Sequence, residues 1–337
     1  MRQLRGVNLG GWLILERWIT PELFVDTDAT DEYSLCQRYP DLAEQRIAQH
    51  RANFVNKDTI RHIKELGLDT VRLPIGYWLF GQEQPFISGA AQYVDRLMDW
   101  CKTDGIGVIL DFHAAPGSQN GWDHSGRSGV IGWGQNDTIE RSCQFLEALV
   151  ERYGKNPALI GLEVLNEPHW DLSIDLLSDY YDRAYRIVRE RYPNLLIIMS
   201  DAFRPEKMAK LLQKRRYEEV MLDVHLYQLF TEADRALNLE GHLRKVDKDW
   251  RHLLHSLTKR MPIIVGEWSA AMHEMYLPVE QPQHVKLYTK NDYITYFRAQ
   301  RQLFEELDVS WTYWTAKTAS GGPWSLIDNP EYLAYRV

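Results

Sequence analysis

Two glutamates, Glu167 and Glu267, each end a short apolar run of the chain. Charged side chains are rarely buried in such runs unless they have a partner or a task. Two carboxyl groups can act together in catalysis when one holds a proton and the other is ionised. A separation of about 5 to 5.5 Å is typical of retaining glycosidases, in which one carboxylate attacks the sugar and the other group serves as acid and then as base. The pair therefore indicates glycoside chemistry by double displacement.

Neighbouring side chains would separate the pKa values of this pair. We expect the positive charge of Arg72 to keep Glu267 ionised. Burial, together with the charge that develops on its partner, would keep Glu167 protonated until it donates to the leaving oxygen. Tyr227 is placed to hydrogen-bond the nucleophile. Asn166 is placed to contact the sugar 2-hydroxyl, where hydrogen bonds strengthen in the transition state.

Eight short apolar runs, rich in β-branched residues, alternate with helical stretches along the chain. Runs that are apolar throughout are typical of parallel strands buried on both faces. Eight of them predict an α/β fold, a closed (β/α)8 TIM barrel, and the whole chain from 1 to 337 is predicted as a single domain. The predicted strands are Gly6–Leu9, Thr70–Pro74, Gly107–His113, Ile160–Asn166, Leu195–Ser200, Val220–Tyr227, Pro262–Trp268 and Ser310–Thr315.

Four helices are predicted between these strands, at Lys57–Leu66, Ala91–Thr103, Thr138–Tyr153 and Leu176–Tyr192. The segments 21–56 and 272–291 are longer than ordinary connections, so we expect them to be insertions at the active site.

Polar residues gather where the predicted strands end, which is where barrel enzymes build their sites. Because so many polar residues converge on one end of the predicted barrel, a functional site is favoured over a set of separate structural charges. They are Arg72, Asp111, His113, Asn166, Glu167, His225, Tyr227, Glu267 and Trp314.

Composition excludes some partners. The net charge is −8 and no cluster of Lys or Arg is present, which argues against nucleic acid or an anionic membrane as a partner. The 12 Trp and 18 Tyr fit either sugar stacking or ordinary core packing. The three cysteines have no metal-type spacing and are expected to be reduced. No secretion signal or membrane span is apparent, so we expect a cytoplasmic protein, or a secreted one if a leader was removed.

Six segments, which include LEVLNEP at 162–168 and PIIVGEWSAA at 262–271, resemble glycoside hydrolase family 5. Within it they are most similar to the fungal-type exo-β-1,3-glucanases, and the resemblance runs from end to end. It implies Glu167 as acid/base, Glu267 as nucleophile, and no cofactor or metal. The other segments are RGVNLGGWLILERWITPELF at 5–24, VRLPIGYW at 71–78, LDFHAAPGSQNGWDHSGR at 110–127 and LDVHLYQLF at 222–230. The family's functional set would fall on Arg72, His113, Asn166, Glu167, His225, Tyr227, Glu267 and Trp314.

The same resemblance implies further substrate-binding residues. Glu16 and Asp123 look like ligands of the nonreducing sugar's hydroxyls, which would close a pocket, while Trp122 and Phe230 resemble an aromatic clamp around the next sugar. Two alternatives stay open. Trp122 could instead be a packed loop anchor, and Glu16 could pair with Arg17 or with the strand-end arginine.

The eighth strand departs from the fungal pattern Trp-Ser-Trp-Lys-Thr-Glu, because this chain reads Trp-Thr-Ala-Lys-Thr-Ala at 314–319. One aromatic and one carboxylate are missing. We expect Ala316 to leave space beside the first sugar, so the linkage, the aglycone preference and the sugar itself can differ from those of the fungal enzymes.

The predicted function is an exo-acting glucan 1,3-β-glucosidase, or β-glucosidase, that acts on a β-linked oligosaccharide or glucoside. Alternatives are an endo-β-glucanase, a β-mannosidase, a glycoside-specific β-glucosidase or a non-catalytic sugar-binding barrel.

A metal-dependent hydrolase built on Asp111, His113 and His225 is disfavoured because the first strand lacks a His-x-His pair. Gly321-Gly322 is interpreted as a turn rather than a phosphate cradle. His124 would either contact substrate or face solvent. The oligomeric state is left open.

Overall fold

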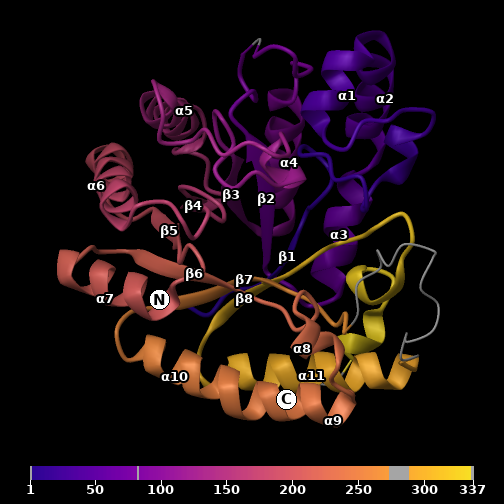
Figure 1. The fold of residues 1–337 in the computed structure, drawn as a ribbon, viewed down its shortest axis with the longest axis vertical. Helices are drawn as coiled ribbons and strands as arrows, with labels where there is room; N and C mark the ends of the chain where they lie inside the picture. The colour runs from indigo at the N-terminus through magenta and orange to yellow at the C-terminus, as the bar shows by residue number, and fades with distance from the viewer. Residues whose placement is uncertain (1, 82, 273–287, 335–337) are drawn as a thin grey trace.

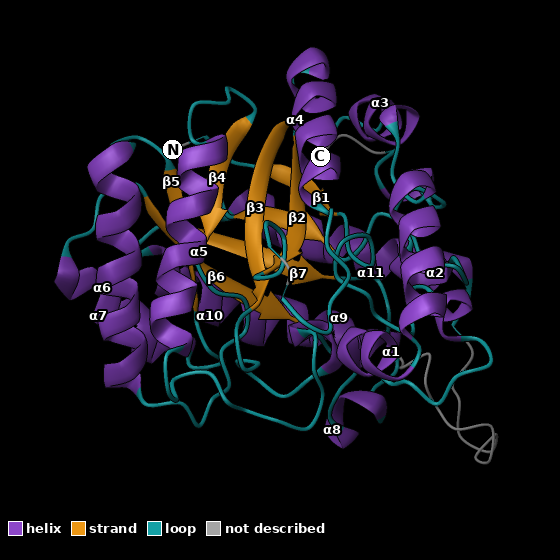
Figure 2. Ribbon diagram, turned by 90° about the horizontal axis from the view of Figure 1, so that it is seen from above, coloured by secondary structure: helices purple, strands orange, loops and turns teal. Residues whose placement is uncertain are grey.

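Eight parallel strands form the centre of the molecule, and the last pairs with the first. The computed structural model describes residues 2–81, 83–272 and 288–334. Figure 2 shows the strands surrounded by helices. The predicted (β/α)8 TIM barrel is therefore confirmed. The strands are β1 (Arg5–Asn8), β2 (Thr70–Gly76), β3 (Gly107–Ala114), β4 (Leu159–Glu163), β5 (Leu196–Ser200), β6 (Val220–Leu226), β7 (Ile263–Trp268) and β8 (Ser310–Tyr313).

The four predicted helices are α3 (Lys57–Glu65), α4 (Ala91–Asp104), α5 (Thr138–Tyr153) and α6 (Ile174–Arg191), each within two residues of the expected bounds. Local chemistry sets their ends. A capping box of Asn56 and Thr59 begins α3, and Gly105, in the left-handed region at φ 70°, ends α4. The remaining helices are α1 (Glu32–Arg38), α2 (Pro40–Asn53), α7 (Pro205–Arg215), α8 (Glu232–Arg235), α9 (Leu239–Lys245), α10 (Arg251–Thr258) and α11 (Lys290–Glu306).

The insertion predicted at 21–56 contains α1 and α2, which enclose a small core of their own that includes Leu35, Ala43 and Ile47. These helices lie on the opposite side of the barrel from α6 and α7 (Figure 1). Thr30 of this insertion lines the cavity described below. Most of the second predicted insertion, 272–291, lies outside the described residues.

The strands are buried on both faces, and every residue of β2 is enclosed. Apolar side chains between strands and helices form the main core, whereas several side chains inside the barrel are polar. Within the described ranges, no helix combines the length and apolar character that a membrane crossing requires.

Candidate active site

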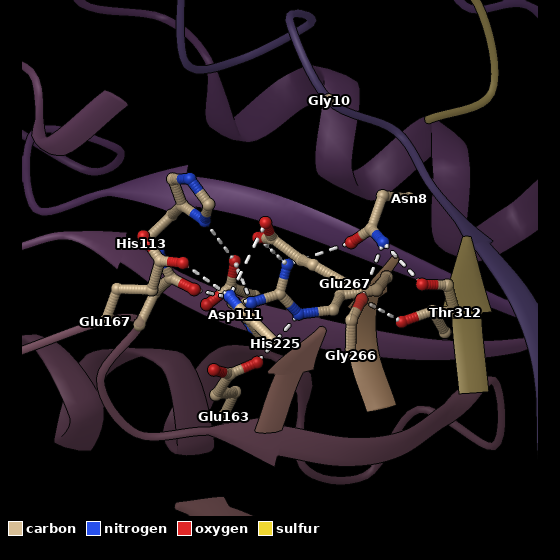
Figure 3. Close-up of polar contacts among 12 residues, drawn as sticks. Asn8, Gly10, Asp111, His113, Glu163, Glu167, His225, Gly266, Glu267 and Thr312 are labelled. Carbon is tan, nitrogen blue, oxygen red and sulfur yellow. Dashed lines mark hydrogen bonds and ion pairs between the residues drawn. The ribbon is translucent and has the colours of Figure 1, made fainter. Parts of the chain in front are cut away.

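A fully buried arginine, Arg72, joins its own strand β2 to four other strands of the barrel. Its Nη1 donates to Asn8 Oδ1 at 2.9 Å and to Glu267 Oε1 at 3.1 Å, and its Nε donates to Glu163 Oε2 at 2.7 Å. Nη2 lies 3.1 Å from Asp111 Oδ2. Burial opposes the charge, but the surrounding carboxylates, Asp111 first, hold the pKa of Arg72 well above its usual value. Figure 3 shows these acids converging on one point. The guanidinium thus supplies the positive charge at their centre.

The predicted contact between Arg72 and Glu267 is confirmed, but Arg72 is not a wall residue. It is the third residue of β2, is 0% exposed, and is not among the residues that line the cavity. Asn166, also enclosed, accepts a hydrogen bond from Arg72 Nη2 at 2.8 Å through Oδ1, while its Nδ2 has no partner in the described part of the chain. Asn166 is 0% exposed and, like Arg72, is not among the residues that line the cavity, so the sugar contact predicted for it stays a prediction.

Two buried acids, Glu163 and Asp223, were missed by the sequence reasoning. Asp223 Oδ1 accepts from Gly266 N at 2.7 Å, and Glu163 receives the Arg72 Nε–H. Burial, which outweighs the nearby positive charge of Arg72, raises the pKa of Glu163 well above its usual value. A signal was available, because Asp111 and His113, like Asp223 and His225, are two residues apart in a strand and so point to the same face.

The two candidate catalytic carboxyl groups face each other. One oxygen of Glu167 lies within 4.8 Å of one oxygen of Glu267. Tyr227 donates to Glu267 Oε2 at 3.1 Å, as predicted. Burial and the charge of Glu267 raise the pKa of Tyr227 well above its usual value, so the phenol remains a donor. Such close carboxyl groups suit double displacement better than the separation of about 6.5 to 9.5 Å found in inverting enzymes.

Glu167 follows β4 rather than ending it. The strand stops at Glu163, three residues before Asn166, where the sequence predicted its end. Glu167 has left-handed backbone geometry at φ 40°, and its carbonyl oxygen accepts from Asn120 Nδ2 at 3.0 Å. The loop thus turns the side chain toward the cavity, which Glu167 lines.

Both oxygens of Glu167 are engaged by imidazoles. His225 Nδ1 lies 2.6 Å from Oε1, a contact visible in Figure 3, and His124 Nε2 lies 3.2 Å from Oε2. Burial works against ionisation of Glu167, yet these two histidines outweigh it and hold the pKa of this carboxyl below its usual range. Our expectation that Glu167 rests in the protonated form is therefore wrong. The contact with His124 was not predicted, because His124 comes from a loop distant in sequence.

A cavity of about 1190 Å³ opens above this pair. Ten of the predicted site residues line it, and its lining also includes residues that we did not predict. The predicted ones are Glu16, His113, Trp122, Asp123, Glu167, His225, Tyr227, Phe230, Glu267 and Trp314; the others include Trp18, Trp170, Phe203 and Trp324. His124, for which we considered either substrate contact or exposure to solvent, also lines the cavity.

Glu16 is buried in the cavity wall, where Oε2 accepts from Trp18 Nε1 at 2.8 Å and Oε1 has no partner in the described structure. Burial and the nearby Asp123 raise the pKa of Glu16 to about 8. Burial also raises the pKa of Asp123. The ion pair that we considered for Glu16 is not formed, since Arg17 donates to the Ala29 carbonyl oxygen and the strand arginine to other acids.

The expectation for Ala316 is wrong. Ala316 is 3% exposed in the core and does not line the cavity. Trp324, in a turn after β8, lines it instead, with its ring centroid 4.9 Å from that of Trp18 and 5.9 Å from that of Tyr227. An aromatic side chain therefore lies near the eighth strand, but it comes from a position eight residues after Ala316.

An aromatic wall forms one side of the cavity rim. It consists of Trp122, Trp170 and Phe203, with ring centroids 5.6 to 5.9 Å apart. Trp170 is 48% exposed. Phe230 is 58% exposed and packs edge-on to Tyr227. Trp122 thus combines the packed position that we considered with a place in the cavity lining.

His113 is held by a contact of 2.6 Å between its Nδ1 and Asp111 Oδ2, and its ring stacks on Trp314 at a centroid distance of 5.6 Å. Burial, with the charge of His124, lowers the pKa of His113 well below its usual value. Gly321 and Gly322, at φ 64° and 70°, lead into a short 3-10 helix, in keeping with the predicted turn.

Comparisons with known proteins agree with this geometry. A family model described as cellulase (glycosyl hydrolase family 5) matches residues 41–320. A probable glucan 1,3-beta-glucosidase A of Emericella nidulans is 38% identical over 281 residues, which cover 81% of this chain and 68% of that protein. Glucan 1,3-beta-glucosidase 1 of Schizosaccharomyces pombe is 32% identical, with 99% of this chain and 87% of that protein covered. A rutinosidase structure from Aspergillus niger has a TM-score of 0.77 at 20% identity, with 98% of each chain covered, a likeness of fold alone.

Proposed function

The chain belongs to glycosyl hydrolase family 5 and is a glycoside hydrolase, and from this premise we propose that it removes terminal glucose from β-1,3-linked glucosides with retention of configuration. The observation that carries the proposal is the approach of Glu167 and Glu267 to within 4.8 Å at the base of one cavity. The names of the two glucosidase relatives support the substrate. The cytoplasmic localisation stays a prediction.

In the proposed reaction, Glu267 attacks the anomeric carbon while Glu167 protonates the departing oxygen. Arg72 and Tyr227 each donate a hydrogen bond to one oxygen of Glu267, which orients the nucleophile. Water, deprotonated by Glu167 in its second role, then releases the sugar in the β configuration. The buried Asn166 Nδ2 has no partner among the described residues and would donate to the 2-hydroxyl.

Exo action is proposed from the acidic end of the cavity. Glu16 Oε1, which has no partner in the part of the chain that the structure describes, and the carboxyl group of Asp123 offer hydrogen-bonding sites for the hydroxyls of a terminal sugar. A buried polar atom without a partner is costly, so a ligand that satisfies it gains affinity. A chain that continued past this point would lose those contacts.

One observation favours a second candidate, a β-glucosidase for glycosides with an apolar aglycone. Trp170, Phe203 and Phe230 are exposed on the cavity rim, and exposed rings of this kind can stack on a flat leaving group as well as on a sugar.

The test is a panel of β-1,3-, β-1,4- and β-1,6-linked glucose oligomers together with aryl glucosides, with products and their first anomer followed by NMR. Release of β-glucose one unit at a time from β-1,3 oligomers is expected. Cleavage of aryl glucosides alone would favour the second candidate, and α-glucose as the first product would contradict the retaining mechanism.

A further inference from the structure

His124 stands in a different position from the other histidine on Glu167. His225 is held from below, since its Nε2 lies 3.2 Å from Asp223 Oδ2 and its Nδ1 is also 3.5 Å from Glu267 Oε2. His124 Nε2 contacts Glu167 alone among the described residues, and its Nδ1 is buried without a partner there. A proton can therefore leave His124 Nε2 without breaking a second interaction, whereas His225 has two other acids to satisfy.

The surroundings of His124 favour its charged form. The titratable groups that face it are Glu16 from the segment after β1, Asp123 beside it, Glu167 after β4, and Asp111 and His113 on β3. The ring centroid of His113 is 5.1 Å away. Burial disfavours the charge, but the hydrogen bond with Glu167 and the charges of Glu167, Glu16 and Asp123 raise the pKa of His124 to about 9. The low pKa of His113 removes it as a competing cation.

Resting on the proposed function, we propose that His124 is a positioning residue that holds Oε2 of Glu167 and supplies the proton that Glu167 passes to the leaving group. In the first half-reaction the Nε2–H bond of His124 breaks as an O–H bond forms on Glu167. That proton then moves to the glycosidic oxygen as its bond to the anomeric carbon breaks and the bond to Glu267 forms. In the second half-reaction the proton lost by water returns through Glu167 to His124, so the cycle balances.

The decisive variant is His124→Gln, because glutamine can keep an N–H donor toward Glu167 Oε2 but cannot take up or release a proton. We compare kcat/KM from pH 4 to 10 on an alkyl β-glucoside, which needs a proton on its leaving oxygen, and on a dinitrophenyl β-glucoside, which does not. The expected loss is at least about tenfold on the alkyl substrate and under about threefold on the dinitrophenyl one. His62→Gln, at an exposed histidine of α3, is the matched control and should change neither.

The pH profile separates proton supply from mere support. The wild-type protein should lose activity on the alkyl glucoside as pH rises through about 9, the pKa of His124, and His124→Gln should lose it at least one pH unit lower. The proposal is overturned if His124→Gln lowers kcat/KM by the same factor at every pH and leaves the alkaline limb of the profile in place. It is also overturned if the variant loses activity equally on both substrates. A wild-type alkaline limb on the alkyl substrate far from pH 9 also overturns it, without any variant having to fold. Failure of the proposed function would look different, since the wild-type protein would then cleave neither glucoside.

Discussion

At the scale of single residues, the site depends on how a few protons are shared among buried acids and histidines. Four carboxyl groups lie around Arg72, and burial raises the pKa of Asp111 among them to about 7. The guanidinium therefore balances only part of the potential negative charge, and burial favours the protonated forms of Asp111 and Glu163, whose pKa values are raised. Within this cluster Glu267 gains two donors, while Glu167 gains two imidazoles.

The two glutamates should respond differently to truncation. Glu267→Ala should reduce kcat at least about 10⁴-fold on every substrate, because no nucleophile remains. Glu167→Ala should lower kcat/KM far more on alkyl than on dinitrophenyl glucosides, since only the former need the proton. Steady-state kinetics on both substrates checks this. Equal losses for Glu167→Ala, or substantial turnover by Glu267→Ala, would refute the roles.

Glu16 should make folding stability depend on pH. Its pKa is about 8 in the folded protein and close to the ordinary glutamate value in the unfolded chain. Its contribution to the free energy of unfolding is therefore greatest below about pH 4.5 and is lost as pH rises to about 8. In Glu16→Gln this loss disappears. The Tm of the variant minus that of the wild-type protein should therefore rise between pH 5 and pH 8, by at least about 2 °C. Thermal melts at both pH values measure it, and a constant difference would contradict the pKa.

Most site residues could be predicted because their types and places at strand ends are visible in the sequence. Arg72 toward Glu267 and Tyr227 toward the same carboxylate are examples, and both contacts are present. The resting state of Glu167 could not be predicted, because His124 approaches it from another loop and no sequence spacing encodes that contact. Trp324 was missed for the same reason.

At the scale of elements, the positions of the eight strands and of the four predicted helices followed from hydrophobic pattern and caps, whereas the inserted helices α1 and α2 were not predicted. Their interface contains a buried ion pair between Arg51 of α2 and Glu32 of α1, 3.7 Å apart. Arg51 Nη1 also donates to the carbonyl oxygens of Ile87 and Ser88 at 3.0 Å each. Such partners are long-range contacts, which an amphipathic pattern does not report.

Removal of the Arg51 guanidinium should lower the stability of the folded protein. Arg51→Met leaves Glu32 buried without its cation and two carbonyl groups without a donor, so we expect a loss of about 3 to 5 kcal/mol in the free energy of unfolding. Arg61→Met in α3 is the control, because its ion pair with Asp58 is exposed and should be worth under about 1 kcal/mol. Urea titrations compare the two. Similar small losses would show that the insertion is not anchored through Arg51.

At the scale of the whole molecule, the net charge of −8 creates a negative field around the protein. This field repels anions and leaves an uncharged ligand unaffected. The closed barrel keeps the cluster in place, since its members come from strands all around the ring.

Salt should therefore separate two classes of substrate. For a neutral β-glucoside, kcat/KM should change less than about twofold between about 20 mM and 500 mM NaCl. For a glucoside with a carboxylate on its aglycone, it should rise with salt as the repulsion is screened. Initial rates at low substrate concentration measure both. A neutral substrate that loses activity steeply with salt would contradict this account.

The pairing of β8 with both β1 and β7 also bears on how the protein is made. While the ribosome is still adding residues before Ser310, β1 has an open edge and its ladder lacks one neighbour. A nascent chain in that state presents unpaired backbone groups on a strand that the finished protein conceals, which invites association with other chains. Chaperone demand should accordingly fall only when the last strand emerges and the ring closes.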